Sequence, residues 1–222
     1  RHDTRYNIAT RSLDLFIDTA ADTTSADNNL RLNNVLAYIS PAFSGVTVAA
    51  AHVFSSDAST AATKGSAFSL AGMYTQGGIY AALATQTAKG GTAGSIGGVT
   101  LATGTELSGT KLAGGYTMDA LNVNATVEKT SVKSAGTDAT ASNYALGGKY
   151  SVSATDAVKL GYAKTGKTST SATDNSSSRV SLGYDHDMSK RTSVYALYTK
   201  STTADSATAD PSVVSVGMKH AF

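Results

Sequence analysis

The chain has 222 residues, a formal net charge of +2 and no cysteine. The small charge gives no indication of a nucleic-acid partner, and the absence of cysteine excludes disulfides and thiolate metal sites. Thr, Ser, Val, Tyr and Gly are plentiful and proline occurs only twice, which favours β-strands. No run approaches the ~20 apolar residues of a transmembrane helix, so two classes remain: a water-soluble protein, or a membrane β-barrel whose signal lies in alternation.

Residues 3–30 fit neither a strand pattern nor a flexible loop. Leu13, Phe16 and Ile17 recur at helical spacing, and Ser12 stands where a helix cap is expected. The spacing therefore predicts a short helix that packs its apolar face on the rest of the protein.

Acidic residues follow the same spacing. Asp14, Asp18 and Asp22 are four residues apart, so a helix that continued through them would carry three carboxylates on one stripe. The alternative is a solvated acidic face with local ion pairs, for instance Arg11 with Asp14.

From Arg31 onward, β-like segments alternate with turns. Eleven strands are predicted, near residues 31–39, 46–54, 66–75, 78–86, 109–118, 120–129, 142–152, 156–164, 178–186, 191–200 and 212–222. The fold class is therefore all-β.

The connections between these strands alternate between two lengths. The short ones lie at 40–45, 76–77, 119, 153–155 and 187–190, and the long ones at 55–65, 87–108, 130–141, 165–177 and 201–211. Such alternation places all short turns at one end, as in an antiparallel up-and-down transmembrane β-barrel.

Aromatic residues mark one end of the strands. Tyr38, Tyr74, Tyr116, Tyr150, Tyr184 and Phe222 each lie near the end of a strand that runs into a short turn or into the last residue. They are predicted to form an aromatic girdle at a membrane interface.

The faces of the strands differ in polarity. In 120–129, Leu, Val and Ala alternate with Asn, Thr and Glu, and the last eleven residues also alternate. Four lysines are candidates for a water-filled lumen: Lys111, Lys149, Lys159 and Lys219. Segments 46–54 and 78–86 are rich in Ala on both faces, which suggests contact with a neighbouring subunit or a crowded lumen.

Three segments together resemble the general, trimeric porins of β-proteobacteria. Residues 31–45 have the pattern R-x-N-N-x-x-x-Y-x-S-P-x-F-x-G, residues 1–11 read RHDTRYNIATR, and the chain ends on GMKHAF. The resemblance implies a sixteen-stranded outer-membrane barrel whose third loop folds into the lumen. On this basis, 1–30 hold the end of a strand and the constriction loop, 31–222 form the barrel wall as strands six to sixteen, and the first five strands are missing from the sequence.

The resemblance also implies a function and a set of partners. The expected function is passive diffusion of ions and small hydrophilic solutes through a water-filled channel in the outer membrane of a Gram-negative bacterium. The expected partners are outer-membrane lipid, lipopolysaccharide and two further copies in a homotrimer, with no cofactor and no metal.

Charge filtering is the expected role of the acidic stripe. Asp14, Asp18 and Asp22 would face basic residues across the narrowest part of the lumen. The candidates for the basic side are Arg1, Arg5, Arg11 and Arg31. Arg31 is expected to point inward, on the opposite side of its strand from Leu32.

Two other classes of protein are alternatives to the channel. A barrel enzyme would need a base such as His186, which lies between Asp185 and Asp187, but adjacent strand residues point to opposite faces. No Gly-x-Ser-x-Gly elbow or phosphate loop is present. A secreted adhesin or β-solenoid would show a fixed repeat period, whereas the loop lengths here vary.

Overall fold

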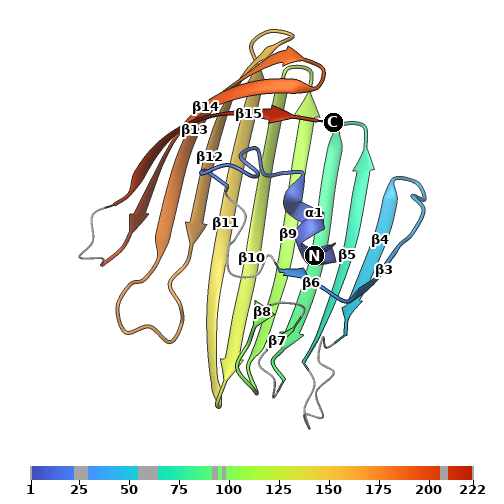
Figure 1. Ribbon diagram of the computed structural model, residues 1–222, viewed down its shortest axis with the longest axis vertical. Coiled ribbons are helices and arrows are strands. Elements are labelled where there is room, and N and C mark those ends of the chain that lie inside the picture. The colour runs from blue at the N-terminus through green and yellow to red at the C-terminus, as the bar shows by residue number, and fades with distance from the viewer. Residues whose placement is uncertain are drawn as a thin grey trace.

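The computed structural model describes residues 2–22, 30–54, 65–91, 95–96, 99–205 and 210–221. Eleven antiparallel strands form one curved sheet in the order β15-β14-β13-β12-β11-β10-β9-β6-β5-β4-β3, wrapped around the helix α1 (Figure 1). The strands of this sheet are β3 (Val35–Ile39), β4 (Val46–Val53), β5 (Ser66–Gln76), β6 (Ile79–Lys89), β9 (Glu106–Met118), β10 (Leu121–Ser134), β11 (Thr137–Ser151), β12 (Asp156–Thr165), β13 (Ser177–Ser189), β14 (Thr192–Thr203) and β15 (Ser212–His220). The count of eleven and the up-and-down order confirm the all-β prediction.

Two small sheets complete the described strands. β1 (His2–Asp3) pairs with β2 (Arg31–Leu32), and β7 (Ser95–Ile96) pairs with β8 (Val99–Thr100). The predicted strand at 31–39 is therefore divided into β2 and β3 at Asn33 and Asn34, where Asn34 has a φ of 54°. Asparagine tolerates this left-handed conformation better than most residues, so the division falls where the sequence allows it.

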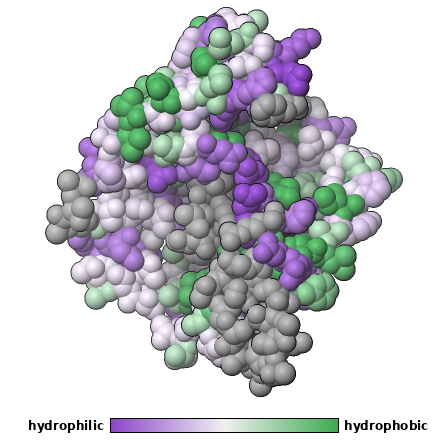
Figure 2. Space-filling model, in the orientation of Figure 1, coloured by the Kyte–Doolittle hydropathy of each residue, from purple (hydrophilic) through white to green (hydrophobic). Residues whose placement is uncertain are grey.

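The large sheet has one apolar and one polar face. The outer face carries exposed hydrophobic residues such as Leu112, Leu146 and Leu160, whereas Lys111 and Glu128 are buried on the inner face that curves around α1. Hydrophilic residues make up much of the surface around the hollow, and hydrophobic ones gather toward the margins of the sheet (Figure 2). This polarity confirms the predicted alternation.

The segment 130–141 is a strand hairpin and not the long loop that the sequence predicted. β10 and β11 stay in register as far as Ser134 and Thr137, and the chain turns at Ala135 and Gly136 with φ values of 48° and 82°. The turn is of the kind that matches the twist of two antiparallel strands. Ser and Thr suggested a loop, but both are compatible with strands wherever neither face has to be apolar.

The helix lies earlier in the chain than predicted. α1 spans Arg5–Arg11, with the side chain of Thr4 accepting from the Asn7 amide, whereas residues 12–22 form successive turns. Asp14 Oδ1 accepts a hydrogen bond from the Phe16 amide at 2.8 Å, and Asp18 has a φ of 60°. Both features stop a helix from continuing. The predicted stripe of three carboxylates on one helix is therefore wrong. Among the described residues, no helix is long and apolar enough to cross a membrane.

Two glycines on the inner face make room for residues 12–22, which we call the inner segment. A Cβ atom on Gly183 would lie 2.8 Å from Cε1 of Phe16, and one on Gly115 would lie 2.9 Å from Cδ2 of Leu13. Two of the apolar residues that predicted a helix, Leu13 and Phe16, instead occupy these gaps in the wall. Their packing on the wall agrees with the predicted role of that apolar face.

We predict that Gly183→Ala lowers the free energy of unfolding by about 1–3 kcal/mol, because the added methyl group overpacks against Phe16. Gly148→Ala is the matched control, since nothing lies within 4 Å of its added Cβ, and it should be neutral or slightly stabilising. Urea unfolding in detergent micelles measures both. Equal effects of the two substitutions would contradict this packing.

Candidate pore constriction

A buried polar cluster attaches α1 to the wall. Tyr6 Oη donates to Glu128 Oε1 at 2.5 Å, Asn143 Nδ2 donates to Glu128 Oε2 at 2.8 Å, and Lys111 Nζ lies 3.5 Å from Glu128 Oε1. Lys111 Nζ also lies 4.2 Å from the centre of the Tyr6 ring, a cation–π distance. We call Tyr6, Lys111, Glu128 and Asn143 the Glu128 cluster.

Tyr6 acts in this cluster as a hydrogen-bond donor. Burial, followed by the negative charge of Glu128, raises the pKa of Tyr6 well above its ordinary range. The phenol therefore stays protonated, and both carboxylate oxygens of Glu128 have donors. A buried charge is tolerated when it is paired and hydrogen-bonded in this way.

The rest of α1 lies on β5 and β6. Thr4 Oγ1 donates to Gln86 Oε1 at 2.8 Å, the Arg5 amide donates to Ser69 Oγ at 3.0 Å, and Tyr80 Oη donates to the Ala9 carbonyl at 2.6 Å. The small inner-face residues Ala71, Ala82 and Ala84 pack against Tyr6 and Ala9. Alanine on the inner face of these strands is thus explained by a crowded hollow, one of the two explanations that the composition left open.

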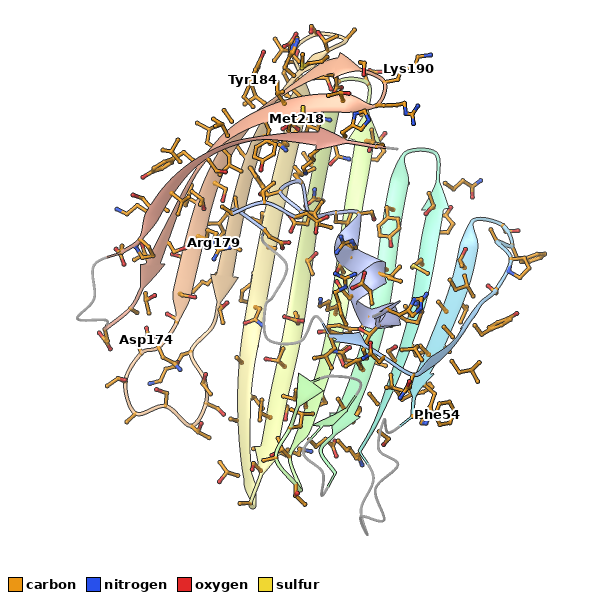
Figure 3. All side chains as sticks on the ribbon, viewed as in Figure 1. Phe54, Asp174, Arg179, Tyr184, Lys190 and Met218 are labelled. Carbon is orange, nitrogen blue, oxygen red and sulfur yellow. The ribbon has the colours of Figure 1, made fainter. Side chains whose placement is uncertain are left out.

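Three cations of the wall hold the inner segment by its backbone. Lys159 Nζ donates to the Leu15 carbonyl at 2.9 Å, Lys219 Nζ to the Ile17 carbonyl at 3.0 Å, and Arg179 Nη1 to the Asp22 carbonyl at 2.6 Å (Figure 3 shows Arg179). These side chains come from β12, β15 and β13, so the contacts span most of one half of the sheet. Hydrogen bonds from charged donors are stronger than neutral ones, which suits a segment built from short turns and not from a continuous helix.

The predicted acidic residues have different environments. Asp14 is buried, whereas Asp18 is exposed and its Oδ2 lies 2.9 Å from Arg11 Nη2. Asp22 Oδ2 accepts from the Asp18 amide at 3.3 Å. Arg11 forms a local ion pair with Asp18, whereas the alternative had suggested Asp14 as its partner. Arg11 at the end of α1 and Asp18 of the inner segment, with side-chain exposures of 36% and 68%, form a charged pair that faces solvent.

Two other predicted arginines, Arg5 and Arg31, contact Asp3 near the start of the chain. Arg5 is buried and donates through Nη2 to the Asp3 carbonyl, and Arg31 Nε lies 3.1 Å from Asp3 Oδ1. Leu32, expected to face away from the lumen, is instead fully buried among inner-face residues such as Val53, so that expectation was wrong. Arg1 lies outside the described residues.

The four lumen lysines all lie on the inner face. Lys111 and Lys159 are buried there, and Lys219 contacts the inner segment. Lys149 is half-buried and lies opposite Asn122 and Lys159 on the neighbouring strands. Four site residues carried no prediction from the sequence: Tyr6, Glu128, Asn143 and Arg179. Glu128 carried a signal, because it is the acidic residue at an inward position of a strand directly after the strand of Lys111.

The predicted aromatic residues lie where the strands reach the short turns. Tyr116 and Tyr150 on β9 and β11 are exposed on the outer face, and Tyr184 lies on the same end of the sheet as Lys190, opposite Asp174 (Figure 3). Tyr38 is also exposed and Tyr74 is half-buried. Phe222 lies outside the described residues. The arrangement agrees with a girdle, whose membrane role remains a proposal.

His186 has a partner that the sequence did not suggest. Its Nδ1 lies 2.8 Å from Oδ1 of Asp156, and Asp156 also accepts from Tyr184 and Ser153. In the part of the chain that the structure describes, no group of three or more His, Cys, Asp or Glu side chains could hold a metal ion.

A sheet with an apolar outer face and a polar inner face around an anchored segment defines the wall of a membrane β-barrel. The chain belongs to the Gram-negative porin family, whose model matches residues 3–206. It is therefore an outer-membrane porin chain.

Solved structures agree with this assignment. An anion-selective porin from Comamonas acidovorans is 25% identical, with 93% of this chain and 65% of that chain covered at a TM-score of 0.75. OmpT of Vibrio cholerae is 18% identical, with 84% of this chain and 63% of that chain covered at a TM-score of 0.66. DcaP of Acinetobacter baumannii is 11% identical, with 85% and 62% covered at a TM-score of 0.60. The last two show the fold alone. The chain spans less than two thirds of the length of each of these three relatives. No curated protein sequence matches it.

We predict that Glu128→Ala destabilises the protein by about 3–5 kcal/mol, because it leaves Lys111 charged and buried without its partner. The double substitution Lys111→Met with Glu128→Leu should cost less than Glu128→Ala alone. Urea unfolding measures the stability, and trypsin cleavage after Arg11 reports release of α1.

The matched control for this prediction is the exposed pair of Lys89 and Glu106, 3.2 Å apart. Glu106→Ala should cost no more than about 1 kcal/mol, because water screens an exposed pair. A Glu128→Ala variant as stable as Glu106→Ala would show that the Glu128 cluster does not hold the helix.

Proposed function

We propose that this chain forms most of the wall and the constriction of a water-filled channel through which ions and small hydrophilic solutes diffuse passively across the outer membrane. The observation that carries the proposal is the position of α1 and the inner segment, which lie on the polar face of a sheet whose other face is apolar. A solute that passes inside such a wall meets hydrated polar groups and is selected by width and charge.

Two further properties of the whole protein belong to this proposal. The sheet has two edges, β3 and β15, and unpaired edges are not tolerated in lipid. We infer that additional strands close the barrel between them. OmpT of Vibrio cholerae has a structure described as a trimer form, which supports a homotrimer here, with outer-membrane lipid and lipopolysaccharide around it.

Charge filtering at the constriction rests on the pair of Arg11 and Asp18. This exposed pair joins the end of α1 to the inner segment, whereas Asp14 uses its carboxylate to cap the Phe16 amide. Half-buried Lys149 adds positive charge to the inner wall. A solved relative is described as anion-selective, and a predominance of wall cations would favour anions here too.

The direct test is conductance of the full-length protein in a planar lipid bilayer. Stepwise increases of current with linear dependence on salt are expected for an open, water-filled pore. A protein that is folded and inserted but gives no steps would reject the channel.

We predict that Asp18→Asn shifts the reversal potential in a salt gradient toward anions, because Arg11 then loses its counter-charge. Asp14→Asn should leave the reversal potential nearly unchanged, since Asp14 is buried. Asp119→Asn, the same change in a short turn on the rim of the sheet, is the control. An equal shift for Asp18→Asn and Asp119→Asn would remove Asp18 from the constriction.

A further inference from the structure

A cavity lies between the inner segment and the wall. Its floor is formed by the inner faces of β10, β11 and β12, and its roof by Thr10 of α1 together with Leu13, Asp14, Leu15 and Phe16 of the inner segment. The cavity has a volume of about 60 Å³. We call it the inner-segment cavity. The inner segment is therefore fastened to the wall with a space left beneath it.

The cavity exists because its floor carries four very small residues. Gly147 of β11 pairs with Gly161 of β12, and Ala145 pairs with Ala163 beside them. All four line the cavity. A Cβ atom on Gly147 would lie 2.6 Å from Oδ1 of Asn124, so the Asn124 amide lies over this glycine. Larger side chains at these positions would fill the space that separates the wall from the inner segment.

The hydroxyl group of Thr10 is left over from the folding of the roof. Thr10 lines the cavity and is only 4% exposed, and no group of the described residues forms a hydrogen bond with its Oγ1. A threonine hydroxyl within a helix can bond to the carbonyl one turn earlier, but this one does not. A buried hydroxyl without a partner is costly, so an occupant of the cavity that bonds to Thr10 would be stabilised.

Uncharged polar groups line the same space. They belong to Asn124, Thr126 and Thr165 of the floor, and an amide or hydroxyl side chain both donates and accepts hydrogen bonds. Leu13 and Phe16 on the roof and the two alanines of the floor add apolar surface. This combination fits a molecule that carries hydroxyl groups on a short carbon chain.

The charges around the cavity favour a neutral occupant. Asp14, Glu128 and Lys111 also line it, and two carboxylates against one ammonium disfavour an anion. Both carboxylate oxygens of Glu128 already accept hydrogen bonds within the Glu128 cluster, and Asp14 Oδ1 accepts from the Phe16 amide. The carboxylates therefore have little capacity left for a cation, whereas the neutral groups can bind a neutral molecule.

The volume sets the size of the occupant. At about 10–15 Å³ for each water, 60 Å³ corresponds to roughly four to six water positions, or to a solute with a similar number of non-hydrogen atoms. Glycerol, with three carbons and three oxygens, is at the upper end of this range. Longer polyols exceed it.

We propose that the inner-segment cavity binds a small neutral polyol of about the size of glycerol, which Thr10 and Asn124 hold by hydrogen bonds against the floor of small residues. The proposal deepens the proposed channel by naming a class of solute for which it has a site, and it rests on the inner segment lying in a hydrated lumen. Binding does not require ion flow, so loss of conductance and loss of binding can be observed separately.

The test is binding of glycerol to the full-length protein in an amine-oxide detergent, whose headgroup carries no hydroxyl, measured by saturation-transfer NMR. The wild type should bind glycerol saturably. Thr10→Val keeps the shape of the side chain and removes its hydroxyl, so it should weaken binding about five-fold through the loss of one neutral hydrogen bond. Ala163→Leu fills the cavity and should abolish saturable binding.

Thr199→Val is the matched control. Thr199 is buried on the inner face of β14, and its hydroxyl is hydrogen-bonded to that of Ser181 at 2.9 Å, away from the cavity. The substitution should leave the glycerol affinity unchanged. Absence of saturable glycerol binding to the wild type, or an unchanged affinity in both Thr10→Val and Ala163→Leu, would overturn the proposal.

Three other solutes test the chemistry of the occupant. Acetate and methylammonium, a small anion and a small cation, should bind at least about ten-fold more weakly than glycerol, because a charge is costly to bury without a counter-charge. Sorbitol should not bind, because it is too long for the cavity. Acetate or methylammonium binding as tightly as glycerol would overturn the proposal by assigning the cavity to a charged solute.

Discussion

A strand that separates lipid from water can give only every second side chain to each side. This constraint explains most of the molecule. Outward positions hold residues such as Leu112 and Leu160, and inward positions hold Lys111, Glu128 and Lys159, often one residue away in the chain. Because the backbone hydrogen bonds are made between strands, the polar inner residues remain available to hold a segment inside.

The constriction depends on these polar residues of the inner face. α1 has only seven residues and no apolar core of its own, so its position depends on the wall. The Glu128 cluster provides a buried charge with several donors, and the wall cations donate to backbone carbonyls of the inner segment. Glycines at 115 and 183 then set how closely Leu13 and Phe16 approach the wall. Charge and shape thus act on the same short stretch of chain.

The sequence predicted the sheet better than the site, for a physical reason. Period-two alternation and turn residues are local, so the eleven strands and their outer faces could be identified without neighbours. The hairpin at 130–141 was missed because a strand that is polar on both faces has no alternation. The helix was misplaced because Leu13, Phe16 and Ile17 have helical spacing, although Leu13 and Phe16 fill gaps beside Gly115 and Gly183 in the wall. The contact of Tyr6 with Glu128 joins residues 122 positions apart, and no local pattern contains it.

The central claim is that the inner segment lies against the inner face of the sheet in the folded porin. The chain has no cysteine, so a pair introduced at Leu13 and Gly115 can be tested for disulfide formation without background. Mild oxidation of the refolded full-length protein should cross-link Leu13→Cys with Gly115→Cys rapidly and nearly completely. The pair Leu13→Cys with Gly148→Cys, whose second partner lies on the outer face, should stay reduced. Failure of the first pair to cross-link in the folded protein, or equal cross-linking of both pairs, would contradict the account.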